Sequence, residues 1–185
     1  MMTIFCTAHN DNIAYNIIEE LQSTGYPIID ISIVVHDPNF KSILTDGVKT
    51  EIDVKAPYQC ALGDVLCGSL GWIDDIDSVP IAGIGHLIVT GPLLSSLSLA
   101  ALDIGTGGIA GMLMHQDVPE SQAKNLESQI RDKCFMIAVH ALNERDAHHI
   151  VSIFVKEGAE YVVSVHNTEQ HISTRAQEST AQHSH

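Results

Sequence analysis

The chain has 185 residues, 45% of them hydrophobic, so it can bury a core without disulfides. It carries 23 acidic and 9 basic side chains, a formal net charge of -14 at pH 7. This charge repels phosphate backbones, which excludes nucleic acid as an expected partner. The four cysteines form no C-x-x-C pair, and residues 1–10 lack a basic region followed by an apolar run. We therefore expect a reducing, cytoplasmic setting.

Residues 3–37 and 134–167 each predict a strand, a helix and a second strand. The first strand in each segment is a short run rich in branched and aromatic side chains, Ile4–His9 and Phe135–His140. Each predicted helix has one apolar stripe at positions i, i+3, i+4 and i+7. The stripes are Ala14, Ile17, Ile18 and Leu21, and Ala147, Ile150, Val151 and Phe154. The shared offsets indicate a duplicated strand-helix-strand unit.

The two predicted helices also share their start and stop signals. Asn10 and Asn143 precede them, and an Asn side chain there accepts backbone N–H bonds. Gly25 and Gly158 follow them, where left-handed backbone commonly ends a helix. The second strands are predicted at Ile28–His36 and Tyr161–His166. We expect an α+β protein whose two units interleave into a four-stranded, ferredoxin-like sheet with helices on one face.

A long segment of different composition separates the two units. Residues 37–57 are polar and turn-rich, which predicts an exposed loop. Residues 58–116 are predicted to be a helical insert, within which residues 78–102 carry no charge. Its centre is expected to be a glycine-rich hairpin of two helices, Leu93–Leu102 and Ile104–Met114. A further helix at residues 119–133 then leads into the second unit, with Ala123, Leu126 and Ile130 as its apolar face.

The charge-free run is long enough to consider a transmembrane helix, which needs about 20 apolar residues. Glycines and prolines interrupt its first half, and no Lys or Arg flanks it, so a broken hairpin is favoured. Helices that are apolar nearly all round must be covered by the sheet, a second subunit or lipid. We expect a homo-oligomer, with peripheral membrane contact as an alternative. The predicted self-association residues are Leu93, Leu97, Ala101, Gly105, Gly107 and Gly111.

These elements predict one domain over residues 1–167. Residues 168–185 are polar and aperiodic, which predicts a disordered tail.

Four histidines, His9, His36, His140 and His166, end the four predicted strands. Parallel strands within a unit would place His9 and His36 at one sheet edge, and likewise His140 and His166. Imidazole is a common metal ligand, so these four are candidate ligands. No H-x3-H, H-E-x-x-H or paired-cysteine spacing supports a metal site, however. We expect no cofactor, and we expect His148 and His149 to lie on the surface.

The sequence contains no catalytic signature. Residues 105–111 superficially fit a dinucleotide fingerprint, but they follow a predicted helix where a strand is required. No G-x-S-x-G motif is present. Cys60 and Cys67 lie seven residues apart without basic neighbours, which is typical of buried small hydrophobes. The protein is therefore expected not to be an enzyme.

Several local motifs resemble the bacterial general-stress and low-temperature-induced family, which includes heat-induced stress proteins. The matching segments are residues 79–85, 90–93, 107–111 and 118–120, with Ala123, Glu127 and Ile130. His86, where the family tends to have proline, and Asp103 depart from the pattern. The resemblance implies a bacterial stress-associated protein, cytoplasmic or membrane-peripheral, and supplies no catalytic residues. The leading hypothesis is a non-enzymatic assembly or binding module; the alternatives are a peripheral membrane protein and a metal-binding protein that uses the strand-end histidines.

Overall fold

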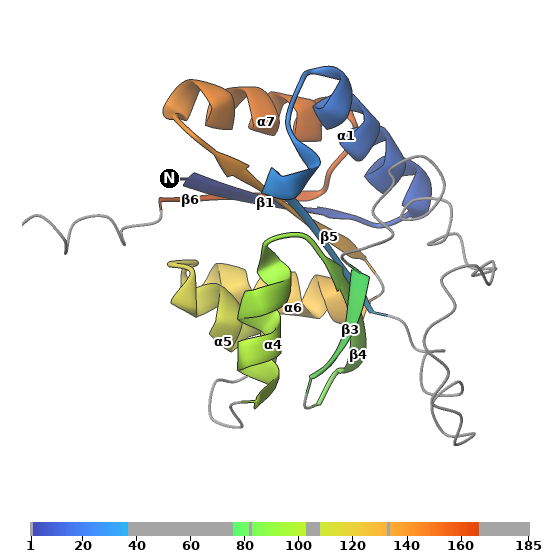
Figure 1. Cartoon of the computed structure of the whole chain (residues 1–185), viewed down its shortest axis with the longest axis vertical. Coiled ribbons are helices and arrows are strands. Elements are labelled where there is room, and N and C mark those ends of the chain that lie inside the picture. The colour runs from blue at the N-terminus through green and yellow to red at the C-terminus, as the bar shows by residue number, and fades with distance from the viewer. Residues whose placement is uncertain (1, 37–75, 82, 103–107, 133, 167–185) are drawn as a thin grey trace, which may run out of the picture.

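The computed structural model describes residues 2–36, 76–81, 83–102, 108–132 and 134–166. Six antiparallel strands form one sheet in the order β3-β4-β2-β5-β1-β6. Helices α1 and α7 cover one face, and α4, α5 and α6 cover the other (Figure 1). The protein is therefore α+β, with a sheet enclosed between two helical layers.

The strands are β1 (Met2–Ala8), β2 (Ile31–His36), β3 (Ile76–Ile81), β4 (Gly85–Thr90), β5 (Phe135–Ala141) and β6 (Tyr161–His166). The α-helices are α1 (Asp11–Ser23), α4 (Leu93–Leu102), α5 (Gly108–His115), α6 (Glu120–Arg131) and α7 (Glu144–Lys156). A short 3-10 helix, η1 (Ile28–Asp30), precedes β2 and occupies the start of the strand predicted there.

The strands of the two predicted units alternate in the sheet. β1 pairs antiparallel with both β5 and β6, and β2 pairs antiparallel with β5. β1 and β2 therefore run in the same direction with β5 between them, and β5 and β6 run in the same direction with β1 between them. The prediction of helices on one face is wrong for the whole sheet, because the insert supplies a second helical layer.

The predicted helix signals are confirmed. The Asn10 side chain accepts a hydrogen bond from the Ile13 amide at 2.8 Å, and the Asn143 side chain accepts one from the Asp146 amide at 3.0 Å. These bonds satisfy amide groups that have no partner within the helix. Gly25 and Gly158 adopt φ values of +93° and +87° beyond the helix ends, which glycine tolerates without a steric cost.

The first helical layer forms one core with the sheet. The predicted stripe of α1 is fully buried: Ala14, Ile17, Ile18 and Leu21. In α7 the buried residues are Ala147, Ile150, Ile153 and Phe154. Val151 is only partly buried, and Ile153 is buried in addition, because α7 packs against α1 as well as against the strands. The buried face of α7 is thus rotated from the predicted one.

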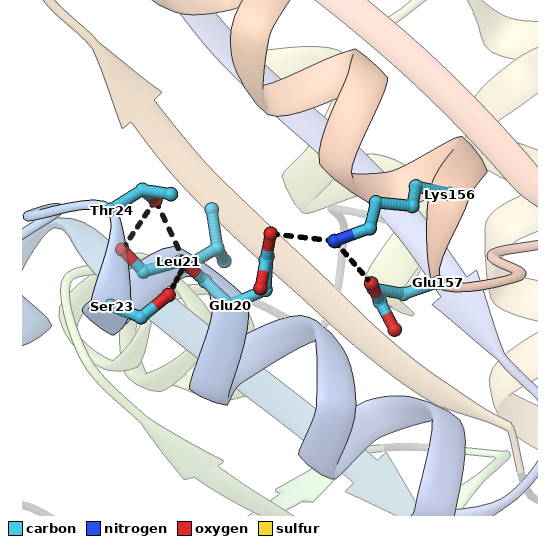
Figure 2. Close-up of polar contacts among 6 residues, drawn as sticks. All are labelled: Glu20, Leu21, Ser23, Thr24, Lys156 and Glu157. Carbon is cyan, nitrogen blue, oxygen red and sulfur yellow. Dashed lines mark hydrogen bonds and ion pairs between the residues drawn. The ribbon is translucent and has the colours of Figure 1, made fainter.

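Figure 2 shows the polar contacts that join α1 to α7. Lys156 Nζ lies 2.7 Å from Glu20 Oε1 and 3.3 Å from a carboxylate oxygen of Glu157. The Thr24 hydroxyl donates to the backbone carbonyls of Glu20 and Leu21 at 2.8 and 2.9 Å. The ion pair is exposed and contributes little to stability, whereas the hydroxyl satisfies carbonyls at the end of α1.

Part of the predicted helical insert is instead a β-hairpin. β3 and β4 pair antiparallel, and β4 extends the sheet by pairing with β2. The residues that face the helical layer alternate along the strands, Val79 with Ile81 and Leu87 with Val89, as a half-buried strand requires. Pro80 is tolerated because β3 is an edge strand. The prediction was wrong here because glycine and proline obscured this period-two pattern.

The predicted first helix of the hairpin matches α4, and α5 ends one residue beyond the predicted second helix. The start predicted for that second helix falls at residues 103–107, outside the described residues. The predicted loop, the first part of the insert with Cys60 and Cys67, and the predicted tail also lie outside them. Within the described ranges, the chain contains no helix with the length and apolarity needed to cross a bilayer.

The turn between β4 and α4 brings the chain close to the start of β2. Gly91 has a φ of +81°, and a Cβ atom there would lie 2.1 Å from the Ile31 carbonyl oxygen. The Leu93 amide donates to the buried Ser32 hydroxyl at 3.0 Å. Only glycine fits this approach, and Ser32 satisfies an amide at the start of α4.

Glu127, on α6, connects this helix to α5 and, through Arg131, to the turn of the β-hairpin. One carboxylate oxygen, Oε2, accepts a hydrogen bond from the Ala110 amide in the first turn of α5 at 2.8 Å. The other, Oε1, lies 2.8 Å from the Arg131 guanidinium, which also donates to the Gly83 carbonyl at 2.9 Å. Helix α6 thereby holds both the start of α5 and the turn of the β-hairpin.

Candidate functional site

The sheet does not bring the four strand-end histidines together. His9 and His36 lie at one end of the sheet, and His140 and His166 at the other, because β1 and β2 run opposite to β5 and β6. Within each pair one strand intervenes, so the backbones are about 10 Å apart. A metal ion requires several ligands at about 2 Å. No group of three His, Cys, Asp or Glu side chains in the described part of the chain could hold one.

Each strand-end histidine lies in a different environment. His9 Nδ1 is 2.9 Å from Glu160 Oε1 in an exposed ion pair. His140 Nδ1 is 2.9 Å from the Thr3 hydroxyl across neighbouring strands. His36 ends β2, and His166 lies opposite Met2 at the end of β6.

The predicted self-association residues are divided between the core and undescribed segments. Leu93 and Leu97 are 1% and 0% exposed and belong to this chain's own core, as does buried Gly111. They are therefore not available at the surface to a second copy. Ala101 lies in α4, while Gly105 and Gly107 fall outside the described residues. Among the described side chains of this hairpin, a self-association surface would have to use exposed residues of α4 other than Leu93 and Leu97.

A polar cavity lies at the sheet end where β5 finishes and β2 begins. One wall is the connection from α1 to β2, and the other is the connection from β5 into α7. The cavity volume is about 370 Å³, which is within the range of small-molecule sites. The lining residues are Thr24, Gly25, Tyr26, Pro27, Asp30, His140, Leu142, Asp146 and His149.

Tyr26 joins the two walls of the cavity. Its hydroxyl lies 3.1 Å from His149 Nδ1 and 3.3 Å from the Asp146 carbonyl oxygen. The rings of Tyr26 and His149 are tilted by 36°, with centroids 5.9 Å apart. Burial and, second, the charge of Asp146 raise the pKa of Tyr26, so the phenol stays protonated at neutral pH. Tyr26 therefore acts as a hydrogen-bond donor and an aromatic surface.

His140, near the end of β5, also lines the cavity. Burial lowers the pKa of His140, and the nearby carboxylate of Asp30 partly opposes this shift. The imidazole is consequently neutral at pH 7, and the cavity keeps the negative charges of Asp30 and Asp146. One oxygen of Asp146 already accepts from the Asn143 side-chain amide at 2.7 Å. The described residues that line the cavity include no lysine and no arginine.

His140 was among the candidate residues predicted from the sequence, whereas Tyr26, Asp30 and Asp146 were not, and His149 was predicted only to lie on the surface. Tyr26 and His149 are 123 positions apart, so no local spacing relates them. One signal was present: both connections follow a recognised helix or strand end and carry polar side chains. The sequence did not show that β2 begins next to the end of β5, because this depends on the strand order of the sheet.

A second hollow lies along the outer face of α4. Its volume is about 510 Å³, and its lining residues are Ile29, Asp77, Gly91, Pro92, Leu94, Ser95 and Ser98. Large apolar side chains stand beside it, with Ile29 76% exposed and Leu99 68% exposed. Asp77 is the one charged residue among the described residues of its lining. We call this surface, formed by Ile29, Leu94, Ser95, Ser98 and Leu99, the α4 face.

Comparisons with models of protein families, with curated proteins and with solved structures each found no match. The resemblance to the bacterial general-stress family therefore stays a prediction.

Proposed function

We propose that this protein is a non-enzymatic assembly module that pairs with a second copy of itself through the α4 face. The observation that carries the proposal is the exposure of Leu99 and Ile29 beside a nearly uncharged hollow. Exposed apolar groups that gather around a hollow are typical of interaction surfaces. This retains the self-association expected from the sequence but moves it from the buried side of the hairpin to its outer side.

The geometry of α4 favours a second copy as the occupant. Leu94, Ser95, Ser98 and Leu99 occupy one side of the helix, at positions i, i+1, i+4 and i+5. The hollow is lined by Leu94, Ser95 and Ser98, and the exposed Leu99 directly follows Ser98 in the helix. A two-fold axis would therefore place Leu99 of each copy into the hollow of the other, as isologous interfaces require. The serines are small enough to let two helices approach closely.

Charge supports the same occupant. Two copies with a net charge of -14 each repel one another over most of their surfaces. Residues 78–102 carry no charge, so α4 itself adds nothing to this repulsion, and Asp77 is the charged residue nearest to the proposed interface among the described lining residues. The same negative charge disfavours an anionic bilayer, which leaves peripheral membrane contact as the second candidate.

The proposal also includes the ferredoxin-like fold and the cytoplasmic, stress-associated role that were expected from the sequence. Strands β2, β5, β1 and β6 would form a ferredoxin-like duplicated unit, supported by their order and by the shared helix caps. Residues 76–132 would then elaborate that unit and supply the interface. The cytoplasmic, stress-associated role rests on the composition and on the motif resemblance.

Substitution of Leu99 tests the interface, and Val155 provides a matched control. Val155 is 65% exposed on α7, on the opposite side of the sheet. We expect Leu99→Glu to dissociate the dimer in sedimentation equilibrium, because it places two carboxylates in an apolar interface, and Val155→Glu to leave it intact. Equal behaviour of the two variants would contradict the proposal. Binding of the protein to vesicles of zwitterionic lipid should be measured as well. If the native chain forms no dimer but binds the vesicles, and Leu99→Glu abolishes this binding, peripheral membrane contact would be favoured instead.

A further inference from the structure

The polar cavity at Tyr26 has chemistry that the proposed assembly role does not use. It combines a partly open volume, an aromatic wall and two carboxylates, and its residues come from segments far apart in the sequence. The α4 face lines a separate hollow with none of these residues. The cavity can therefore be considered as an independent site.

The charges of the lining residues select the sign of a ligand. Asp30 and Asp146 contribute two carboxylates, burial keeps His140 neutral at pH 7, and the described lining residues include no lysine or arginine. The Asp30 carboxylate makes no hydrogen bond to any described residue. The N-terminus of α7 offsets part of the charge of Asp146, which also accepts from Asn143. Asp30 is consequently the acceptor most available to a cationic group.

The shape and ring arrangement select the kind of cation. Within the described ranges, no three metal-ligating side chains converge, which disfavours a bare metal ion. A volume of about 370 Å³ accommodates a molecule of several non-hydrogen atoms. The Tyr26 ring provides a face that attracts a cation, in addition to the Coulombic attraction of the carboxylates. Exposed Leu142 at the mouth can contact an aliphatic chain.

We propose that this cavity binds a small organic cation with N–H donors, an alkylammonium compound, between Asp30 and the ring of Tyr26. One ammonium group would donate to the Asp30 carboxylate, and the adjoining methylene groups would lie against Tyr26 and Leu142. The carboxylate of Asp146 and the neutral imidazole of His140 would complete the acceptors around the site.

Three four-carbon compounds separate charge from size in the test. We expect 1,4-diaminobutane, titrated into the full chain, to shift the NMR signals of the Tyr26, His140 and His149 rings with saturable behaviour. The neutral 1,4-butanediol and the anionic succinate, which have the same chain length, should leave these signals unchanged. Equal shifts from all three compounds, or no saturable shift from the diamine, would overturn the proposal.

Matched charge variants separate a specific site from general attraction to an acidic protein. Asp30→Asn should weaken diamine binding at least tenfold, whereas Asp132→Asn, which removes the same charge at the end of α6, should change it less than twofold. Equal weakening by both would refute a specific site. If Asp30→Asn melts below the native chain, Tyr26→Leu provides the second variant: it retains both carboxylates, and unchanged binding would refute the aromatic contact.

Discussion

Replacement of Glu127 by alanine is expected to destabilise the protein through the start of α5. The Glu127 carboxylate accepts from the Ala110 amide at 2.8 Å and is 15% exposed. A hydrogen bond to a charged group contributes about 1.5–3 kcal/mol, and loss of a helix cap costs about 0.5–2 kcal/mol. Both figures refer to the bond between Glu127 and the Ala110 amide, so they are not added together. The ion pair between Glu127 and Arg131 adds about 0.3–0.5 kcal/mol. We therefore expect a loss of about 2–3 kcal/mol.

Urea denaturation measures this loss directly, and thermal melting should show a decrease in Tm of about 5–10 °C for a chain of this length. Glu120→Ala is the control, because Glu120 also pairs with a cation four residues later on α6. Its side chain caps no other helix in the described structure, so its effect should be clearly smaller. Glu127→Gln keeps an acceptor oxygen and should fall between the two. Equal losses for the two alanine variants would refute the capping role.

Three further predictions concern the backbone, a histidine and a cysteine. Gly91→Ala should lower the free energy of unfolding, measured by denaturant titration, more than Gly83→Ala does. Both glycines have φ near +80°, but of the two only Gly91 would place a Cβ atom against a backbone oxygen. Equal losses of stability would contradict the close approach. Burial lowers the pKa of His140 below 6.5, so the folded state binds fewer protons and the free energy of unfolding should fall as pH drops from about 6.5 through the folded-state pKa. The NMR titration midpoint of His140 should lie below 6.5 and fall further in Asp30→Asn; a midpoint above 6.5 would show the opposite sign. Burial raises the pKa of Cys6 well above 9.0, so iodoacetamide at pH 8 should label it only after unfolding, as peptide mapping would reveal; rapid labelling of the native chain would contradict its burial.

The elements that the sequence predicted best are those with local signals. A cap, a stripe and a terminal glycine mark α1 and α7, and each of these signals acts within a few residues. The β-hairpin lacked such signals, because Pro80 and the neighbouring glycines suggested a broken helix. Its strands form because β4 adds to the open edge of β2, which is a long-range contact.

The functional surfaces were less predictable for the same reason. The apolar length of α4 indicated an interface, but its two sides differ in exposure. Leu93 and Leu97 face this chain's own core, whereas Leu99 is exposed. Nearly uniform hydrophobicity around the helix gave no means of distinguishing them. The cavity forms where the α1–β2 connection lies beside the β5–α7 connection. This neighbourhood follows from the strand order, which could not be predicted from the sequence.

The molar mass of the purified chain in solution tests the central claim, self-association through the α4 face, most directly. The chain has a mass of 20.0 kDa, and light scattering at micromolar concentration should give twice that value without detergent. Added salt should preserve or strengthen the dimer, because it screens the repulsion between two acidic copies. A mass of 20.0 kDa at every concentration and salt level would contradict the account.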